Sequence, residues 1–325
     1  RPASPESFAS LAAIIGSPSM VSRRNVARGG TPASGPCAAP PGGHDAAPEG
    51  RGDGPEPWED AMQAAKLGDA VIRYADEGDR AGAPVLFANS LGTDLRVWDA
   101  MVGLLPDGLR LIRYDKRGHG LSELTPGPYA IERLADDAAA LLDRLEAPGA
   151  LVVGLSIGGM IAQSLAARRP DLVKGVVLMD TAAKIATPEV WEERLSAVEA
   201  GGIAAISEAT LGRWFPPSFH RSRPEETAVW RNMLERTPKD GYVACGRAIQ
   251  AADLTEGTRA LRLPALGIAG SEDLSTPPDL VAGTLKLIPG SRMEVIEGSG
   301  HLPCVDRPAM VAAMLTGFLQ DLNLV

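Results

Sequence analysis

The chain has 325 residues, of which 45% are hydrophobic, and its formal net charge at pH 7 is −9. This acidic balance argues against nucleic acid as a partner, because nucleic acid favours basic protein surfaces. No apolar run approaches the roughly 20 residues that a membrane-spanning helix needs, so we expect no membrane partner. The three cysteines, Cys37, Cys245 and Cys304, are far apart, which is typical of reduced thiols in a cytoplasmic protein.

Residues 1–62 differ in composition from the rest of the chain. They hold 10 of the 27 prolines, together with many glycines, alanines and serines. Such a segment buries too little apolar surface to offset the entropy of ordering it. We therefore expect a disordered N-terminal extension over residues 1–62 and a folded domain over residues 63–325.

Strands and helices alternate along most of the folded domain. Short apolar runs predict strands at residues 70–74, 84–89, 109–114, 151–154, 175–179, 264–269 and 292–296. Helical patterns lie among them at residues 95–105, 131–145, 160–168, 280–287 and 309–322. This alternation predicts an α/β fold with a mostly parallel, doubly wound sheet.

The alternation stops between about residues 183 and 261. This stretch contains only helical patterns, at residues 190–199, 203–211, 225–236 and 242–251, separated by loops. Because a strand pattern precedes it and another follows it, the stretch is interpreted as a helical cap inserted into the sheet domain.

A serine lies where a predicted strand turns into a predicted helix. The strand at residues 151–154 runs into Gly154-Leu155-Ser156-Ile157-Gly158, and a helical pattern follows. A tight strand–turn–helix lifts the serine side chain clear of the backbone and needs small residues on both sides. Ser156 is therefore the candidate nucleophile; the alternative is a glycine-lined turn with an idle serine.

A serine nucleophile needs an imidazole base beside it, and the chain has four histidines. His44 lies in the expected extension and His220 lies in the expected cap. His301 follows the last predicted strand, at the end of the sheet where active sites of open parallel sheets form. His301 is therefore the candidate base.

The fourth histidine, His119, lies in a glycine-rich loop. It precedes Ser156, whereas the strand–turn–helix serine is followed in the chain by its acid and then by its histidine. We interpret His119 as a structural residue in a loop that Asp115 and Arg117 hold together.

The acid that orients the base should follow the strand predicted at residues 264–269. The loop after this strand contains Glu272 and Asp273. Asp273 is the candidate acid, with Glu272 as the alternative. Ser156, Asp273 and His301 then lie at the ends of three strands in the order that this type of site requires.

A serine attack on a carbonyl creates an oxyanion, which needs preorganised hydrogen-bond donors. The backbone N–H of Ile157, directly after the nucleophile, is one candidate. The N–H of Leu91, in the loop after the strand at residues 84–89, is the other. No group of His, Cys, Asp and Glu residues has the spacing of a metal site, and serine chemistry needs no cofactor, so we expect neither.

At this point the chain resembles the α/β-hydrolase superfamily over residues 66–325 and, within it, the 3-oxoadipate enol-lactonase family. The resemblance rests on four segments. They are Asn89-Ser90-Leu91-Gly92-Thr93-Asp94 with Trp98, Tyr114-Asp115-Lys116-Arg117-Gly118-His119-Gly120-Leu121-Ser122, Gly154-Leu155-Ser156-Ile157-Gly158-Gly159, and Arg213-Trp214-Phe215. The first segment is the most discriminating, because many relatives carry His-Gly in place of Asn89-Ser90.

The resemblance implies an activity: hydrolysis of the small-molecule lactone 3-oxoadipate enol-lactone through an acyl-enzyme, without a cofactor, in the β-ketoadipate pathway of aromatic catabolism. The free carboxylate of that substrate needs a cation. Arg213 is a candidate, since arginine binds carboxylates through two parallel hydrogen bonds, and Trp214 beside it is a candidate pocket wall. The alternatives are a surface arginine and a tryptophan that only packs the cap.

Two other functions remain open. The same triad occurs in carboxylesterases, C–C bond hydrolases and perhydrolases, so it does not select the substrate. A ligand-binding protein on an inactive hydrolase fold is the second alternative, and it would be expected to lack a member of the triad.

Overall fold

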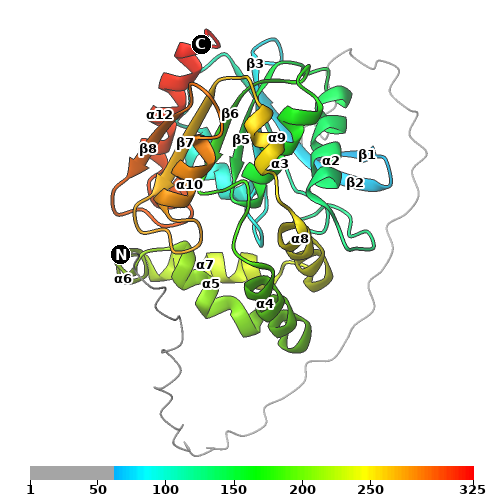
Figure 1. The fold of residues 1–325 in the computed structure, drawn as a ribbon, viewed down its shortest axis with the longest axis vertical. Helices are drawn as coiled ribbons and strands as arrows, with labels where there is room; N and C mark the ends of the chain where they lie inside the picture. The colour runs from blue at the N-terminus through cyan, green and yellow to red at the C-terminus, as the bar shows by residue number, and fades with distance from the viewer. Residues whose placement is uncertain (1–61) are drawn as a thin grey trace, which may run out of the picture. The chain divides into compact units, whose positions relative to one another are not determined.

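A computed structural model describes residues 62–325, so the extension expected over residues 1–62 lies outside the described range except for Met62. Within that range the chain forms one eight-stranded sheet (Figure 1). Its strands are β1 (Gln63–Leu67), β2 (Ala70–Gly78), β3 (Ala83–Ala88), β4 (Leu109–Tyr114), β5 (Ala150–Leu155), β6 (Val173–Met179), β7 (Ala265–Gly270) and β8 (Arg292–Ile296).

The sheet order is β1-β2-β4-β3-β5-β6-β7-β8. Strand β2 pairs antiparallel with both β1 and β4, and every other pairing is parallel. The prediction of an α/β fold with a mostly parallel sheet is therefore confirmed. The register sets Ala88 beside Gly154 and Leu155 beside Met179, so the loops after β3, β5 and β6 begin next to one another.

The middle of the sheet is apolar because it is covered on both faces. All six residues of β5 are buried, as expected for a central parallel strand. The flanking helices are η1 (Leu95–Trp98), α1 (Asp99–Val102), α2 (Ile131–Arg144), α3 (Ile157–Arg168), α10 (Pro278–Leu285), α11 (Pro303–Asp306) and α12 (Pro308–Asp321). Helix α3 follows β5 after the single residue Ser156, and nearly all its residues are buried.

Between β6 and β7 the chain contains helices and no strand. These helices are α4 (Pro188–Gly201), η2 (Ile203–Ile206), α5 (Ser207–Trp214), α6 (Pro217–Ser222), α7 (Pro224–Glu235), α8 (Lys239–Ala251) and α9 (Thr255–Ala260). Figure 1 shows α4 to α8 gathered at one end of the sheet. Helix α9 instead packs against α3, so the predicted cap range 183–261 includes one helix that belongs to the layer on the sheet.

Several local predictions differ from the structure. Strand β1 was not expected, because Gln-Ala-Ala-Lys-Leu has little β propensity; it forms by pairing with β2 across the turn at Gly68 and Asp69. The helix predicted at residues 95–105 is a 3₁₀ turn followed by the four residues of α1, and it ends at Gly103. The short helices α6 and α9 were not predicted, because six residues are too few to establish a helical period.

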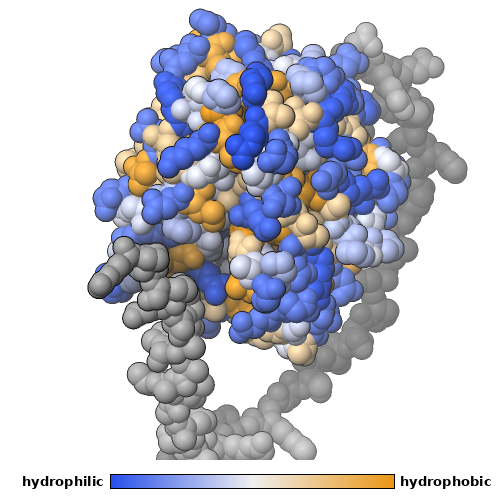
Figure 2. All heavy atoms as spheres, in the orientation of Figure 1, coloured by the Kyte–Doolittle hydropathy of each residue, from blue (hydrophilic) through white to orange (hydrophobic). Residues whose placement is uncertain are grey.

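The face shown in Figure 2 is mainly hydrophilic, with apolar residues scattered over it rather than gathered in one broad patch. This face therefore offers no extended apolar surface for docking. Among residues 62–325, no helix combines the length and the apolarity that crossing a bilayer would require.

Candidate active site

Ser156 lies in a strained turn between β5 and α3. Its φ and ψ are 58° and −120°, a conformation that is unusual for a residue with a side chain. A Cβ atom on Gly154 would lie 2.3 Å from the Gly158 carbonyl oxygen, and one on Gly158 would lie 2.0 Å from the Ala88 carbonyl oxygen. Both positions must therefore be glycine. The turn that they allow is the strand–turn–helix predicted around Ser156, which is called the elbow below.

His301 and Asp273 lie together in loops at the end of the sheet. His301 Nδ1 is 2.8 Å from Asp273 Oδ2, and both side chains are buried. Asp273 also accepts hydrogen bonds from the Ser275 N–H at 2.7 Å and from Thr276 Oγ1 at 2.7 Å. Burial alone would raise the pKa of Asp273, but His301 and these donors hold the pKa below its usual value. The ionised carboxylate can only accept, so Nδ1 of His301 carries the proton of this hydrogen bond and Nε2 is the ring nitrogen that remains for Ser156.

A second buried carboxyl, Asp180, adjoins this pair. A carboxyl oxygen of Asp180, a carboxyl oxygen of Asp273 and a ring nitrogen of His301 all lie within 4.8 Å of one another. Asp180 Oδ1 accepts a hydrogen bond from the Gly270 N–H at 2.9 Å, whereas Oδ2 is buried without a hydrogen-bond partner. Burial, and then the negative charge of Asp273, raise the pKa of Asp180 well above its usual value. The neutral form of the Asp180 carboxyl is therefore favoured beside Asp273.

The elbow connects to this acidic group through the residue after Asp180. The Thr181 hydroxyl donates a hydrogen bond of 2.6 Å to the carbonyl oxygen of Ser156. Within residues 62–325, neither Ser156 Oγ nor His301 Nε2 has a hydrogen-bond partner in the structure. The transfer of a proton between these two side chains therefore stays a prediction.

The two predicted oxyanion donors follow neighbouring strands: Leu91 lies in the loop after β3, and Ile157 is the first residue of α3, directly after the turn that ends β5. Within the described chain, neither the Leu91 N–H nor the Ile157 N–H donates to a protein acceptor. The loop that carries Leu91 is held from its other side. The Gly92 N–H donates to His119 Nε2 at 3.0 Å, and the Leu95 N–H donates to Asp115 Oδ1 at 2.8 Å.

His119 has the structural position that its sequence context suggested. It is fully buried, and burial followed by the charge of Lys116 lowers its pKa well below the usual value. The neutral ring can therefore accept the Gly92 N–H at Nε2. Arg117, the other residue assigned to hold this loop, makes a bidentate pair with Asp137 at 2.6 Å.

The cap contacts the catalytic loops at Trp214. Its carbonyl oxygen accepts the backbone N–H of His301 at 2.9 Å, and its buried indole lies 3.6 Å from the position of a Cβ on Gly92. The structure thus brings Trp214 between the oxyanion loop and the candidate base.

Arg213 lies beside Trp214 on α5. The residue as a whole is exposed, and within residues 62–325 it forms no ion pair with a carboxylate. Loss of hydration around its guanidinium, and then the like charge of Arg194, lower the pKa of Arg213. Arg194 also lacks a carboxylate partner in this range and donates to the Tyr242 hydroxyl at 2.9 Å and 2.5 Å.

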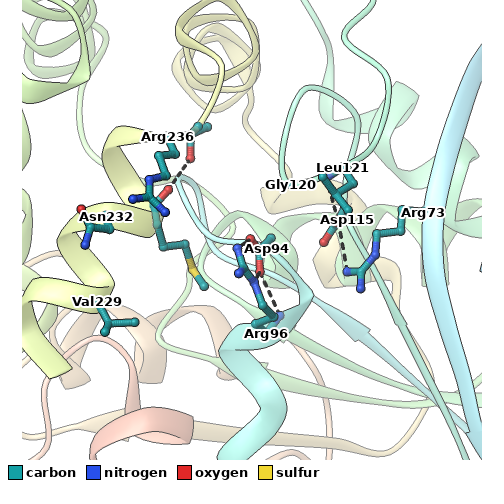
Figure 3. A pocket seen from close by; sticks show the side chains of 11 residues that line it. Arg73, Asp94, Arg96, Asp115, Gly120, Leu121, Val229, Asn232 and Arg236 are labelled. Atoms are coloured by element: carbon teal, nitrogen blue, oxygen red, sulfur yellow. Dashed lines mark hydrogen bonds and ion pairs between the residues drawn. The ribbon is translucent and has the colours of Figure 1, made fainter. Parts of the chain in front are cut away.

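A pocket of about 470 Å³ lies on the outer side of the oxyanion loop (Figure 3). It is lined by residues of that loop, of the loop after β4 and of α7, among them Asp94, Asp115 and Asn232. Ser156, Asp273 and His301 do not line it. The three candidate catalytic residues therefore lie outside this cavity.

Sequence reasoning missed Lys116, Asp180 and Arg194. Lys116 and Asp180 each follow the end of a parallel strand, β4 and β6 respectively. The rule that located Asp273 and His301 at strand ends would have selected them as well. Arg194 has no such signal, because it lies within a cap helix whose packing depends on tertiary contacts.

The chain matches the alpha/beta hydrolase family profile over residues 85–314. It is 35% identical over 240 residues to 3-oxoadipate enol-lactonase 2 of Acinetobacter baylyi, which covers 74% of this chain and 90% of that relative. The crystal structure of an enol-lactonase from Burkholderia xenovorans superposes with a TM-score of 0.77 at 35% identity, covering 79% of this chain and all of that one. A thermophilic esterase from Thermogutta terrifontis, solved with malate bound, has a TM-score of 0.75 at 30% identity and covers 80% and 98%.

The match to the family profile agrees with the mostly parallel sheet and its flanking helices. The resemblance to enol-lactonases that the sequence motifs indicated is confirmed by the relatives and by the solved structure. On this evidence the chain belongs to the alpha/beta hydrolase family.

Proposed function

We propose that this protein is a cytoplasmic serine hydrolase that opens 3-oxoadipate enol-lactone to 3-oxoadipate in the β-ketoadipate pathway. Ser156 is the nucleophile, His301 the general base and Asp273 the acid that orients it. The backbone N–H groups of Leu91 and Ile157 bind the oxyanion.

Acylation starts with the hydroxyl of Ser156. His301 Nε2 takes the hydroxyl proton while Oγ attacks the lactone carbonyl carbon, whose oxygen becomes the oxyanion. Asp273 supports the imidazolium through the 2.8 Å hydrogen bond to Nδ1. When the carbonyl re-forms, the ring C–O bond breaks, and His301 returns the proton to the departing enol oxygen. The enol is a better leaving group than an alkoxide, and it ketonises afterwards.

Deacylation repeats these transfers with water. His301 takes a proton from water as the water oxygen attacks the acyl carbon. The bond to Ser156 Oγ then breaks, and His301 reprotonates the serine. The product carries a new carboxylate, and the enzyme returns to its starting state.

The free carboxylate of the substrate is assigned to the cationic part of the cap. Arg213 is the primary contact and Trp214 forms a wall. The lack of a protein carboxylate at Arg213 within the described range supports this assignment, because an uncompensated and partly desolvated guanidinium attracts an anionic ligand. Arg194, also without a carboxylate partner there, adds positive charge to the same region.

The single observation that carries the choice of substrate is the 35% identity to an enol-lactonase over 90% of that relative's length. The elbow and the His301–Asp273 pair support a serine hydrolase, but they are equally suited to a carboxylesterase. The 30% identity to a thermophilic esterase makes an ester without a lactone ring the second candidate substrate.

Activity on the lactone tests the proposal directly. Purified protein is expected to hydrolyse 3-oxoadipate enol-lactone, measured as loss of lactone absorbance, far faster than simple aryl esters. Ser156→Ala should lower turnover by several orders of magnitude. Ser164→Ala is the matched control, because Ser164 is also buried and lies on α3; it should keep normal turnover.

Two outcomes would contradict parts of the proposal separately. Good cleavage of aryl esters with no lactone turnover would reject the lactonase assignment and keep the serine hydrolase. Normal turnover by Ser156→Ala would reject the serine mechanism itself.

The role of Arg213 is tested with two substrates. Arg213→Ala should raise KM for the carboxylate-bearing lactone by about 10- to 100-fold, as for loss of a hydrogen bond to a charged group. A neutral enol-lactone with the same ring and no carboxylate arm should show no such change. An equal rise in KM for both lactones would reject the carboxylate contact.

A further inference from the structure

The side chain of Lys116 is buried beneath the oxyanion loop. The residue is 2% exposed, and its ammonium donates to the Ser90 carbonyl oxygen at 2.6 Å and to the Thr93 carbonyl oxygen at 3.3 Å. Both acceptors are main-chain atoms in the loop that carries Leu91. A charged group therefore lies within hydrogen-bond distance of the peptide unit that contains the Leu91 N–H.

Lys116 forms no ion pair in the described part of the chain. The nearby carboxylates have other partners: Asp94 pairs with Arg96 at 2.6 Å, and Asp115 accepts the backbone N–H groups of Leu95 and Leu121. A buried cation without an ionic partner is costly. The two carbonyl oxygens accept two of the three hydrogen bonds that the ammonium can donate, but they leave its charge uncompensated.

Peptide geometry links this charge to the site. The Ser90 carbonyl and the Leu91 N–H belong to the same peptide unit, which is trans. In a trans peptide the C=O and N–H bonds point in opposite directions. Since the carbonyl points at Lys116, the Leu91 N–H points away from it, and that N–H has no protein acceptor within the described range.

The geometry points to Lys116 as a positioning residue of the oxyanion hole: its ammonium fixes and polarises the Ser90–Leu91 peptide, so that the Leu91 N–H donates more strongly to the negative charge that develops on the attacked carbonyl oxygen. This inference rests on the proposed function only through its serine chemistry and not through the choice of lactone. The oxyanion that forms during the reaction is a negative charge that the positive charge of Lys116 stabilises, and the resting site has no such charge.

The second oxyanion peptide has a different support. The Ser156 carbonyl oxygen accepts the Thr181 hydroxyl at 2.6 Å and also the N–H groups of Gly159 at 2.8 Å and Met160 at 3.3 Å. All these donors are neutral, and two of them belong to the first turn of α3. The Ser90 carbonyl also has neutral donors, the Thr93 N–H at 3.3 Å and the Thr93 hydroxyl at 2.9 Å. Among residues 62–325, however, only the Leu91 side of the oxyanion hole is also held by a full charge.

The ammonium of Lys116 loses its charge within a pH range that an enzyme assay can cover. Burial lowers the pKa of Lys116 to about 8, although Cys245, Asp115 and Asp94 act in the opposite direction. The ring of His119 also faces this site and is neutral. As the pH rises through about 8, the ammonium loses its charge, so kcat should fall on the alkaline side. The neutral amine can still donate a hydrogen bond to the Ser90 carbonyl. A rise in pH therefore removes the charge of Lys116 while the Ser90–Leu91 peptide keeps its position.

The experiment measures kcat and KM for 4-nitrophenyl acetate between pH 6 and 10 in the full-length chain. Lys116→Met keeps an unbranched side chain that is one atom shorter and removes the charge and the donors. At pH 7 it should lower kcat by about 10- to 100-fold, less than loss of a direct oxyanion donor, with KM nearly unchanged. The alkaline fall of kcat seen in wild type should be absent from this variant.

Two further variants serve as comparisons. Lys174→Met makes the same change at an exposed position on β6 and should keep both kcat and the pH profile of wild type. Thr181→Val removes a neutral donor behind the other oxyanion peptide, so it should lower kcat slightly and leave the alkaline fall in place.

The inference is overturned if Lys116→Met keeps the kcat of wild type, or if its kcat still falls near pH 8. If Lys116→Met does not fold, the wild-type profile decides alone: a kcat that stays level from pH 7 to pH 10 rejects the role of the charge. The Lys116 experiment uses an aryl ester, so it does not depend on whether the protein turns over the lactone. Failure of the lactone assay would reject the proposed substrate and leave the comparison of the Lys116 variants valid.

Discussion

The two halves of the proposed oxyanion hole are built in different ways. The elbow at Ser156 is fixed by its own segment: glycines at positions 154 and 158 permit the strained turn, and the first turn of α3 binds the Ser156 carbonyl. The loop at residues 89–94 has no regular structure of its own. Thr93 donates twice to the Ser90 carbonyl within this loop. The loop is otherwise held by side chains of another loop, chiefly Lys116, His119 and Asp115.

This difference separates two kinds of mutational effect. A change in the elbow acts on the backbone that joins β5 to α3, so it should affect folding and activity together. A change in the loop after β4 acts on the orientation and polarisation of one peptide, so it should lower activity by a smaller factor while the sheet stays folded. The following four changes test that comparison, in order of decreasing effect.

Replacing Gly158 with valine should break the elbow. Its Cβ would lie 2.0 Å from the Ala88 carbonyl oxygen, so either β3 or α3 must move. We expect a loss of about 3 kcal/mol in the free energy of unfolding, as for severe overpacking, and no measurable turnover. Denaturant unfolding measures the first and the ester assay the second. Gly317→Ala, in open space on α12, is the control and should be neutral or slightly stabilising; a folded, active Gly158→Val protein would contradict this account.

Asp273→Asn should remove activity without disturbing either half of the oxyanion hole. The amide would favour the wrong tautomer of His301, so kcat should fall by about 10⁴-fold. Because the pKa of Asp273 is lower in the folded state, its ionised form stabilises the fold above about pH 4, and this contribution is lost as the pH falls. The variant should therefore lose less stability between pH 5 and pH 3 than wild type does in thermal unfolding; an identical acid dependence would argue against an ionised Asp273.

His119→Leu should loosen the loop at residues 89–94. It leaves the buried Gly92 N–H without its acceptor, which should cost about 1–3 kcal/mol of stability, and kcat should fall about tenfold. His119→Gln offers an acceptor of similar reach and should recover most of kcat. If leucine and glutamine behave alike in the assay, the Gly92 contact has no part in positioning the donor.

Thr181→Val should have the smallest effect. The Ser156 carbonyl loses one donor but keeps the N–H groups of Gly159 and Met160, so kcat should fall only about threefold, in line with a hydrogen bond worth about 1 kcal/mol or less. A loss as large as that of Lys116→Met would show that the two halves depend equally on side-chain support.

The same contrast explains what the sequence could predict. The elbow follows from local chemistry, since glycine spacing, an apolar strand and a helical pattern all lie within about 18 residues of one another. The positions of Asp273 and His301 follow from the rule that parallel strands end at one edge, and the structure joins the two by a hydrogen bond.

The remaining features depend on contacts between distant segments. Nothing near Lys116 in the sequence shows that its ammonium meets the Ser90 carbonyl, and nothing near Asp180 shows that its carboxyl adjoins Asp273. Arg194 was not predicted for the same reason, because its partner Tyr242 is 48 residues away. The helices α6 and α9 are too short for their sequence periodicity to reveal them.

The hydrogen bond from the His301 N–H to the Trp214 carbonyl has a consequence for engineering. The cap is joined to the candidate base through main-chain atoms, and the atom that the cap contributes is a carbonyl oxygen, which every residue supplies in the same form. Side chains at positions 213 and 214 can therefore be randomised to recruit new ester substrates while this backbone link keeps the base in register. If the whole cap were replaced by the cap of a relative, the first requirement would be a backbone carbonyl oxygen that accepts the His301 N–H. The choice of side chains would come second.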